Sequence, residues 1–216
     1  LPNLARVFFE MIATEPLCGV GLVSSRGEVF YMNDQGAKHI AGERAVASDL
    51  VGRSLGEFFP AIMMEQRLEI FRRVGANSRP ILVRTLWNGK QLTTWFRRVE
   101  VLAEIPGQAM VIALSRMISG DLRTLFPADA VDLIESTCVR LGALDPLTSQ
   151  ELRVMALIGT GMSVREAAKA LFRAEKTIES HCSSIHAKLG VRDRVDVAKL
   201  AQGAGLTLED ADRTRV

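Results

Sequence analysis

The residues with the clearest capacity for chemistry lie between positions 176 and 188. At the helical angle of about 100° per residue, their small hydroxyl, methyl and basic groups fall on one side of a helix. That face consists of Lys176, Ser180, Ser183 and Ala187, flanked by Thr177, Ser184 and Lys188. A narrow face of this kind lets the backbone approach closely, so that hydroxyls and cations reach phosphates and base edges in a DNA major groove. The pattern predicts a surface that binds double-stranded DNA.

The other side of the same helix is apolar. Ile178, Cys182, Ile185 and Leu189 recur at helical spacing and form one stripe, which must pack against neighbouring helices. A polar outer face also occurs on any small helical bundle whose serines are merely solvated. The face therefore leaves a second interpretation open, in which this region contacts protein rather than DNA.

Other constellations that could do chemistry are missing from the sequence. No paired carboxylates, nucleophile with a base, or phosphate-binding loop occurs at a meaningful spacing, so no enzyme is predicted. His181 and His186 lie about 140° apart on their helix, which argues against a shared metal. Cys18, Cys138 and Cys182 are odd in number and far apart, which suits free thiols in the cytoplasm.

Composition sets the frame for these residues. With 216 residues, 48% of them hydrophobic and 24% charged, the chain is expected to form two globular domains. No apolar run approaches the roughly 20 residues of a membrane span, and the amphipathic start predicts no signal peptide. The net charge of +2 does not by itself indicate nucleic acid. Between 147 and 201, however, the chain has nine Lys and Arg but only six Asp and Glu, and several of these acidic residues complement helix dipoles.

Helix start signals position the polar face. Thr148 with Glu151, and Ser163 with Glu166, each form a capping box that begins a helix. A third helix follows after a tight turn and ends at Gly190. Two helices joined so closely predict a helix-turn-helix.

Residues across this segment carry a family resemblance. The matching positions are Leu147-Thr148, Glu151, Leu157-Ile158, Gly161, Ser163, Glu166, Ala168, Leu171, Thr177-Ile178, His181, Ile185, Lys188-Leu189-Gly190-Val191 and Arg194. In about 55 residues they resemble the LuxR-type DNA-binding domain. The resemblance implies a recognition helix from Glu175 to Leu189 in the major groove. It also implies phosphate contacts from Arg165, Thr177, His181 and Lys188, and a fourth helix from near Asp193 that helps dimerisation.

Two residues depart from the family pattern. Ala174 stands where the family commonly has a serine cap, which would cost on the order of 1 kcal/mol of helix stability. Glu179 stands where the family usually has Lys or Arg, so it either reads a cytosine amino group or weakens binding. With Glu179 included, the predicted DNA-contact set is Arg165, Lys176, Thr177, Glu179, Ser180, His181, Ser183, Ser184 and Lys188.

The N-terminal half has a different sequence pattern, with short β-prone runs separated by turns. The expected strands are 19–24, 28–32, 80–87, 92–102 and 108–114, with Asn88-Gly89 as a tight turn. Two short helical stretches and a helix over 64–74 lie between the second and third strands. This order predicts an α+β domain with a five-stranded antiparallel sheet.

That order resembles a PAS domain, together with Gly27, Val29, Asn33, Ala37, Gly42 and the runs 50–55 and 58–60. The resemblance implies a curved sheet that holds a small ligand, and an N-terminal helix, Leu4 to Ile12, that dimerises. Tyr31, Met32, Trp87 and Trp95 are candidates for the pocket lining, with core packing as their alternative use. The ligand is unknown; His39 is a core or surface histidine in this interpretation, and neither haem nor flavin is expected.

The predicted organisation is a PAS-like domain over 1–115, a linker helix over 116–145, an all-α four-helix LuxR-type domain over 146–206, and a flexible tail over 207–216. The leading hypothesis is a homodimeric, cytoplasmic transcription regulator that binds double-stranded DNA, with RNA polymerase as a further partner and no membrane contact. A phosphorylated receiver is not supported, because the N-terminal half lacks alternating parallel strands. The alternative is a ligand-binding module whose helical region contacts protein.

Overall fold

The computed structural model describes residues 2–76, 79–99, 109–120, 122–127 and 129–216, which form two compact units. The first unit draws on Leu1–Arg84, Leu92–Met117 and Arg123–Ser136. The second unit draws on Thr85–Gln91, Ile118–Leu122 and Thr137–Val216. None of the described helices combines the length and the apolarity that crossing a bilayer requires.

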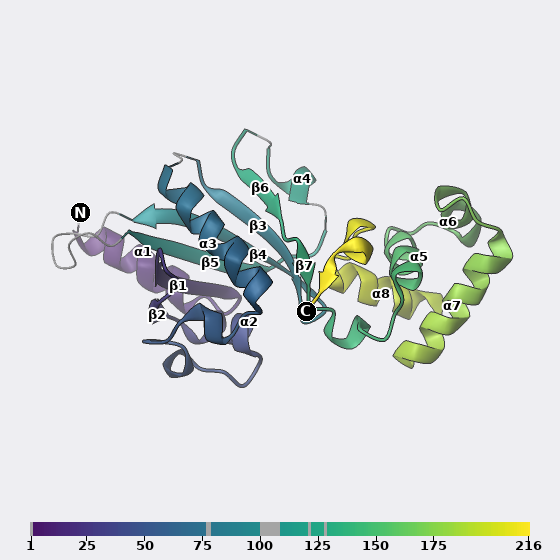
Figure 1. Ribbon diagram of the computed structural model, residues 1–216, viewed down its shortest axis with the longest axis horizontal. Helices are drawn as coiled ribbons and strands as arrows, with labels where there is room; N and C mark the ends of the chain where they lie inside the picture. Colours follow the sequence, from purple (N-terminus) through teal and green to yellow (C-terminus); the bar gives the residue numbers. More distant parts are fainter. Residues whose placement is uncertain (1, 77–78, 100–108, 121, 128) are drawn as a thin grey trace. The chain divides into compact units, whose positions relative to one another are not determined.

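A six-stranded sheet dominates the first unit, in the order β2-β1-β5-β4-β3-β6 (Figure 1). Its strands are β1 (Cys18–Ser24), β2 (Val29–Met32), β3 (Ile81–Trp87), β4 (Lys90–Val99), β5 (Met110–Met117) and β6 (Asp132–Glu135). The pairs β1–β2, β1–β5 and β4–β5 are antiparallel, whereas β6 runs parallel to β3. Asn88 and Gly89 join β3 to β4 with positive φ angles of 52° and 72°, as the predicted tight turn requires.

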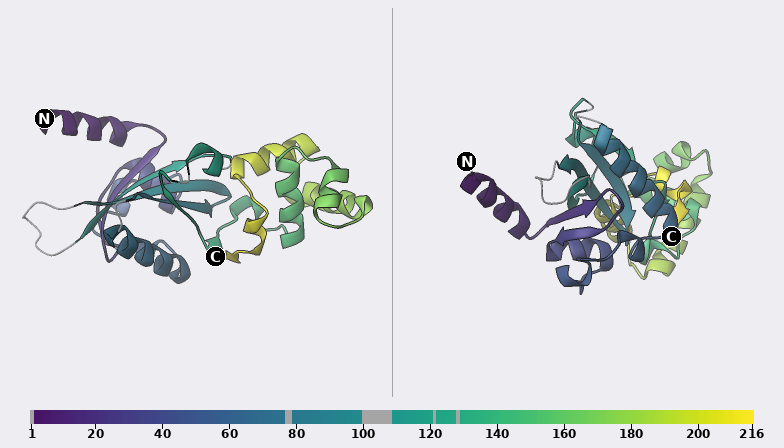
Figure 2. Two further views of the ribbon diagram at one scale, coloured as in Figure 1. Left: turned by 90° about the horizontal axis from the view of Figure 1, so that it is seen from above. Right: turned by 60° about the vertical axis from the view of Figure 1, so that its left-hand side comes forward.

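Helices cover this sheet. They are α1 (Pro2–Thr14), α2 (Asp34–Ala41), the 3-10 turns η1 (Ala47–Asp49) and η2 (Leu55–Glu57), α3 (Ala61–Ala76) and α4 (Leu122–Leu125). Residues of α3 such as Ile70 and Phe71 share a buried core with strand residues such as Val83 and Phe96. Helix α1 lies on the opposite side of the sheet from α3 (Figure 2).

Asn33 fixes where α2 begins. Its side-chain oxygen accepts hydrogen bonds from the backbone of Gly36, at 2.9 Å, and of Val20, at 2.8 Å. Its amide donates to the carbonyls of Ala13 and Cys18, both at 2.8 Å. One asparagine thus caps α2 and ties it to β1 and to the end of α1.

The PAS-like element order is confirmed, with one addition. Five strands and the helices between the second and third lie where the sequence predicts them, although part of the predicted fourth strand falls on residues 100–108, outside the described residues. The prediction of five strands missed β6. This strand pairs with the edge of β3 over Ile81–Arg84, and Glu135 forms an ion pair with the buried Arg84 at 3.1 Å.

The prediction of a linker helix over 116–145 is wrong. The described residues there end β5 and form α4, β6, β7 (Cys138–Val139) and the 3-10 turn η3 (Gly142–Leu144). Val131, Ile134, Cys138 and Leu141 do have helical spacing, but the first two lie in the first unit and the last two are buried in the second. Because the open edge of β3 offers backbone hydrogen-bonding partners, an extended strand satisfies this segment better than an isolated helix.

The second unit is built around four helices, as predicted. They are α5 (Ser149–Gly159), α6 (Val164–Ala170), α7 (Glu175–Leu189) and α8 (Arg194–Ala204). Both capping boxes are present, with Thr148 accepting from Glu151 and Ser163 from Glu166. The core takes residues from all four helices, including Leu152, Ala167, Ile178 and Val197.

The predicted flexible tail is instead part of the second unit. Residues after Leu206 form the 3-10 helix η4 (Glu209–Asp212) and a short strand, β8 (Thr214–Arg215), parallel to β7. Asp210 is buried and accepts a hydrogen bond from Arg213 at 2.6 Å, while Arg215 donates to the carbonyl of Leu147 at 2.7 Å. The charges that suggested a solvated tail are used in these internal contacts.

Candidate nucleic-acid interface and a small cavity

Helix α7 is anchored by its apolar stripe. Ile178 and Ile185 are completely buried, and Cys182 and Leu189 pack against the same core at its margin. Because α5 and α6 both pack on α7, the helix is held in one orientation. Burial also raises the pKa of the Cys182 thiol above its usual value, which favours a neutral packing role.

The opposite face of α7 is open to solvent. Most of the predicted contact residues are exposed there: Lys176, Thr177, Glu179, Ser180 and Ser183. His181 is half-buried, and the hydroxyl of Ser183 donates to the carbonyl of Glu179 at 3.1 Å. The structure therefore brings the small hydroxyl and basic groups together on one surface, as their spacing predicts.

Ser184 and Lys188 have an internal partner that the sequence did not reveal. The Ser184 hydroxyl donates to Oε1 of Glu151 at 2.6 Å, and Nζ of Lys188 donates to Oε2 at 2.7 Å. The same carboxylate accepts from the backbone N–H of Thr148 at 2.7 Å. Glu151 thus closes its capping box on α5 and grips the far half of α7.

The electrostatics of Glu151 follow from this network. The residue is only 4% exposed, and burial alone would raise its pKa. Hydrogen bonds from Lys188, Ser184 and Thr148 outweigh that effect and lower the pKa of Glu151 to about 2. The carboxylate is therefore ionised at neutral pH and holds the Lys188 ammonium at the edge of the exposed face.

Arg165 reaches the same surface from α6. Its guanidinium lies 3.9 Å from the carboxylate of Glu175, and the Arg165 side chain is 73% exposed. An ion pair this open and this long contributes little to stability. Arg165 is therefore available for a phosphate, in line with the role that the family resemblance implies.

The two ends of α7 differ. Gly190 ends the helix in the left-handed conformation, as predicted. At the start, Ala174 provides no side-chain hydrogen bond, which confirms the missing cap, and Glu175 is the acidic residue of the first turn. Helix α7 therefore depends on packing rather than on capping for its position.

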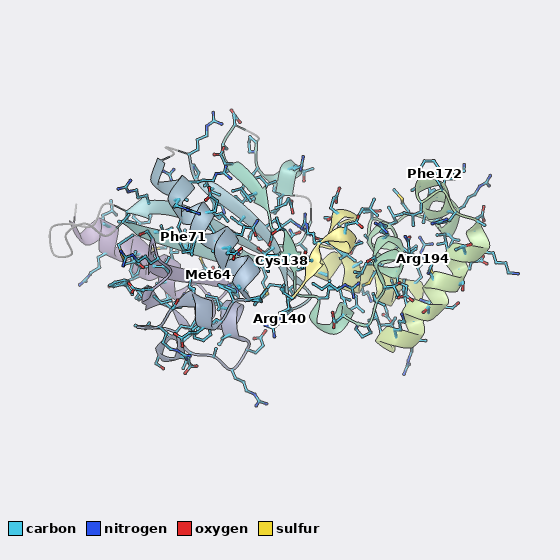
Figure 3. The ribbon with its side chains drawn as sticks, in the orientation of Figure 1. Met64, Phe71, Cys138, Arg140, Phe172 and Arg194 are labelled. Carbon is cyan, nitrogen blue, oxygen red and sulfur yellow. The ribbon has the colours of Figure 1, made fainter. Side chains whose placement is uncertain are left out.

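A small cavity lies in the first unit, on the face of the sheet that α2 and α3 cover. It encloses about 50 Å³ and is lined mainly by apolar groups, among them Phe71, labelled in Figure 3. Four polar side chains also line it: His39, Arg67, Thr94 and Ser115. Both ring nitrogens of His39 form hydrogen bonds within the protein. Nδ1 lies 2.8 Å from Ser115 Oγ, and Nε2 lies 2.8 Å from Gln35 Nε2.

Of the four pocket candidates, Met32 lines this cavity. The other three do not. Tyr31 packs on Phe9, with ring centroids 5.4 Å apart, and Trp95 packs on Phe126 at 5.2 Å. Trp87 is buried in the second unit beneath the Arg140 guanidinium. Alternation along each strand places Trp95 on the face of the sheet opposite the cavity-lining Thr94 and Phe96.

Sequence reasoning missed Glu151 as a partner of α7, and Arg67 and Ser115 as cavity residues. The capping motif accounted fully for Glu151, and nothing in a linear pattern connects it to a lysine 37 residues away. No group of three or more His, Cys, Asp or Glu that could hold a metal ion occurs within the part of the chain that the structure describes.

Comparisons with known proteins agree with this geometry. Residues 145–201 match the model of bacterial regulatory proteins of the luxR family. The Fimbriae Z protein of Salmonella typhimurium is 30% identical over 92 residues, which cover 42% of this chain and 43% of that protein. The transcriptional regulatory protein YhcZ of Bacillus subtilis is 46% identical over 55 residues, or 26% of each chain. The chain thus spans less than half the length of these curated relatives.

Among solved structures, the phage VqmA–DPO complex is 14% identical and has a TM-score of 0.44, covering 95% of this chain and 92% of that one. The family of residues 145–201 is therefore judged from other observations than this structural likeness. These are the match to the family model, the two capping boxes and the four helices with their buried stripe. Residues 145–201 of this chain form a helix-turn-helix domain of the LuxR type, the type that the matching model of bacterial regulatory proteins describes.

Proposed function

We propose that this protein is a sequence-specific, DNA-binding transcription regulator that acts as a homodimer and is tuned by its PAS-like unit. The observation that carries the proposal is α7, whose isoleucines are fully buried while its hydroxyl and basic groups face solvent. A rigid helix with a narrow polar face fits the major groove, where base edges carry sequence information. Arg165, Thr177, His181 and Lys188 are assigned to phosphates, and the remaining exposed groups to the groove.

The proposed dimer uses helix α1. Six of its large apolar side chains are exposed in the isolated chain, and five of the six form the stripe predicted from helical spacing: Leu4, Val7, Phe8, Met11 and Ile12. An exposed apolar stripe of this length is costly unless a partner covers it. A twofold dimer would present two recognition helices to half-sites about 34–36 Å apart.

The cavity is the proposed place of regulation. Its volume of about 50 Å³ admits a few atoms without rearrangement, and its lining combines apolar groups with Arg67, His39 and Ser115. A small ligand with polar groups fits this lining.

A regulator of this class would work in the cytoplasm, where bacterial DNA lies, and RNA polymerase is its proposed further partner at promoters.

The decisive experiment is a DNA-binding titration of the intact chain. Fluorescence anisotropy with pooled genomic fragments and with random duplexes, at two salt concentrations, should show affinity that falls steeply as salt rises. A subset of genomic fragments should bind much more tightly than random duplex. If every double-stranded target lacks salt-sensitive affinity, the regulator assignment is wrong, and the helical region serves protein contacts.

Two variants make the titration specific to α7. Thr177→Ala should weaken binding to all fragments, and Ser180→Ala should change the preference among fragments, because one side chain is assigned to phosphate and the other to base edges. Ser48→Ala, an exposed serine of the first unit, is the matched control and should change neither property.

Native mass spectrometry, compared with denaturing conditions, tests the ligand: a mass lost on denaturation would identify it.

A further inference from the structure

An open groove lies at the turn between α6 and α7, and most of the residues that line it are outside the predicted DNA-contact set. It encloses about 760 Å³ beside the start of α7. The side chains that matter are Arg165, Lys169, Phe172, Arg173, Glu175 and Thr177. Arg165 and Thr177 are already assigned to DNA, so the groove is continuous with the proposed interface.

The groove is strongly basic. Arg165 and Lys169 lie four residues apart on α6 and share a face, and Arg173 follows in the turn. Glu175 is the one acidic residue of the lining, and it pairs with Arg165. Within the described part of the chain, Lys169 and Arg173 are exposed and form no ion pair. Two cations are thus left to attract an anionic partner.

Phe172 is the least expected residue here. Its side chain is 93% exposed, and its φ angle of +53° is one that bulky residues rarely adopt (Figure 3). The backbone forms a Schellman end to α6, with Phe172 N–H bonded to Lys169 O at 3.2 Å and Arg173 N–H bonded to Ala168 O at 2.9 Å. Glycine is the usual residue at this position. The chain therefore keeps a strained, solvated aromatic ring between two free cations.

We propose that a DNA strand beside the site read by α7 crosses this groove, with Lys169 and Arg173 on its phosphates and the Phe172 ring against its sugars or a thymine methyl group. Cations match the phosphates, and an apolar ring suits the sugar or the methyl group that the same strand presents. The inference rests on the proposed function, since it extends the same interface beyond α7. Covering Phe172 in the complex explains why the strain is retained.

The test uses the intact chain and compares single variants in the anisotropy titration. Lys169→Ala and Arg173→Ala should each weaken binding equally for genomic and random duplexes, and each should lower the slope of log affinity against log salt by about one. Lys169→Arg and Arg173→Lys should retain the slope. Lys199→Ala, an exposed lysine on α8, is the matched control and should leave the slope unchanged.

Phe172→Gly separates a binding role from a structural one. Glycine accepts the left-handed conformation without strain, so the thermal midpoint of the variant should rise. Its DNA affinity should nevertheless fall several-fold, with the salt slope unchanged. A rise in stability with undiminished affinity would overturn the role of Phe172.

The two levels of the proposal fail in different ways. If the wild-type protein shows no salt-sensitive affinity for any duplex, the regulator assignment itself fails. If the wild-type protein binds and Thr177→Ala weakens it, but the variants of Lys169 and Arg173 match the wild type in affinity and slope, this inference alone is overturned. The groove would then be left for an acidic protein surface.

Discussion

Glu179 is the residue on α7 whose charge is least suited to a phosphate surface. It is exposed on the same face as Lys176 and Ser183, so its carboxylate would either accept a hydrogen bond from a cytosine amino group or repel the backbone. Replacing it with lysine reverses the local charge where the duplex is proposed to lie.

For Glu179→Lys we therefore expect tighter binding to random duplex and a salt slope steeper by about one. Anisotropy titrations between low and moderate salt measure both quantities. Glu65→Lys makes the same charge change at an exposed position on α3 and serves as the control. A slope identical to that of the wild type would place Glu179 away from the DNA.

Glu151 controls stability through its protonation. The folded state lowers its pKa from 4.5 to about 2, so the ionised carboxylate is bound more favourably in the folded protein than in the unfolded chain. The contribution is complete above about pH 4.5 and is lost as the pH falls towards 2. At full strength it amounts to at most about 3 kcal/mol.

Glu151→Gln should accordingly lower the free energy of unfolding at pH 7 and flatten its decline between pH 4.5 and 2. Urea denaturation followed by circular dichroism, repeated along the pH series, measures this difference. Glu166→Gln alters the other capping box; because hydrogen bonds from Ser163 also lower the pKa of Glu166, its pH profile should flatten in the same direction, but by less, since this carboxylate is exposed. Parallel profiles for wild type and Glu151→Gln would show that the network contributes nothing.

At the scale of elements, α7 is the helix most dependent on its neighbours. It has no side-chain cap at Ala174, yet Ile178 and Ile185 are fully buried and Glu151 holds its second half. Tertiary contacts rather than local signals therefore set its position. This leaves room for a local improvement at its start.

Ala174→Ser should stabilise the protein by about 1 kcal/mol, because a serine side chain there can accept from the free N–H groups of the first turn. The thermal midpoint should rise, as differential scanning calorimetry would detect. Ala170→Ser, an exposed position in the last turn of α6, is the matched control and should lower stability slightly. No gain at Ala174 would mean that the turn cannot place a hydroxyl over the helix end.

The edge of the sheet at β3 is closed by a distant segment of the chain. Strand β6 pairs with β3 through Ile81–Arg84, and the Arg84–Glu135 ion pair lies within that pairing. An unpaired β3 would expose a row of backbone donors and acceptors to other chains. The segment predicted to be a helix instead closes this edge.

At the scale of the whole molecule, the two units are not joined by a single linker. The second unit includes Thr85–Gln91 from the β3–β4 hairpin and Ile118–Leu122 after β5, as well as the helical region. Gly89 of the hairpin donates to Arg140 O at 3.1 Å, and Gln91 donates to Ile118 O at 2.7 Å. Several chain segments thus pass from one unit to the other.

The proposed dimer of the whole molecule depends on the exposed apolar stripe of α1. Phe8→Asp combined with Met11→Asp should convert the proposed dimer to a monomer, because charges on the apolar stripe cannot be buried without cost. Sedimentation equilibrium measures the change. DNA affinity for paired half-sites should fall by about 10²-fold, since the second head no longer binds intramolecularly.

The matched control is Arg6→Gln, an exposed change on the same helix. It should leave both the mass and the affinity unaltered. A double variant that stays dimeric would move the dimer interface away from α1.

The sequence by itself determined what depends on neighbours along the chain. Thr148 with Glu151, Ser163 with Glu166, Gly190 and the 178–189 stripe predicted three helices and the face that α7 exposes, because capping and helical periodicity act over a few residues. The turn at Asn88-Gly89 was equally local. Tertiary structure alone decided what depends on distant partners: β6 against β3, the folded tail, Glu151 under Lys188, and the cavity lined by Met32 rather than by the tryptophans. A hydrogen-bonding edge or a buried carboxylate selects its partner by position in space, and residue spacing along one segment carries no record of that choice.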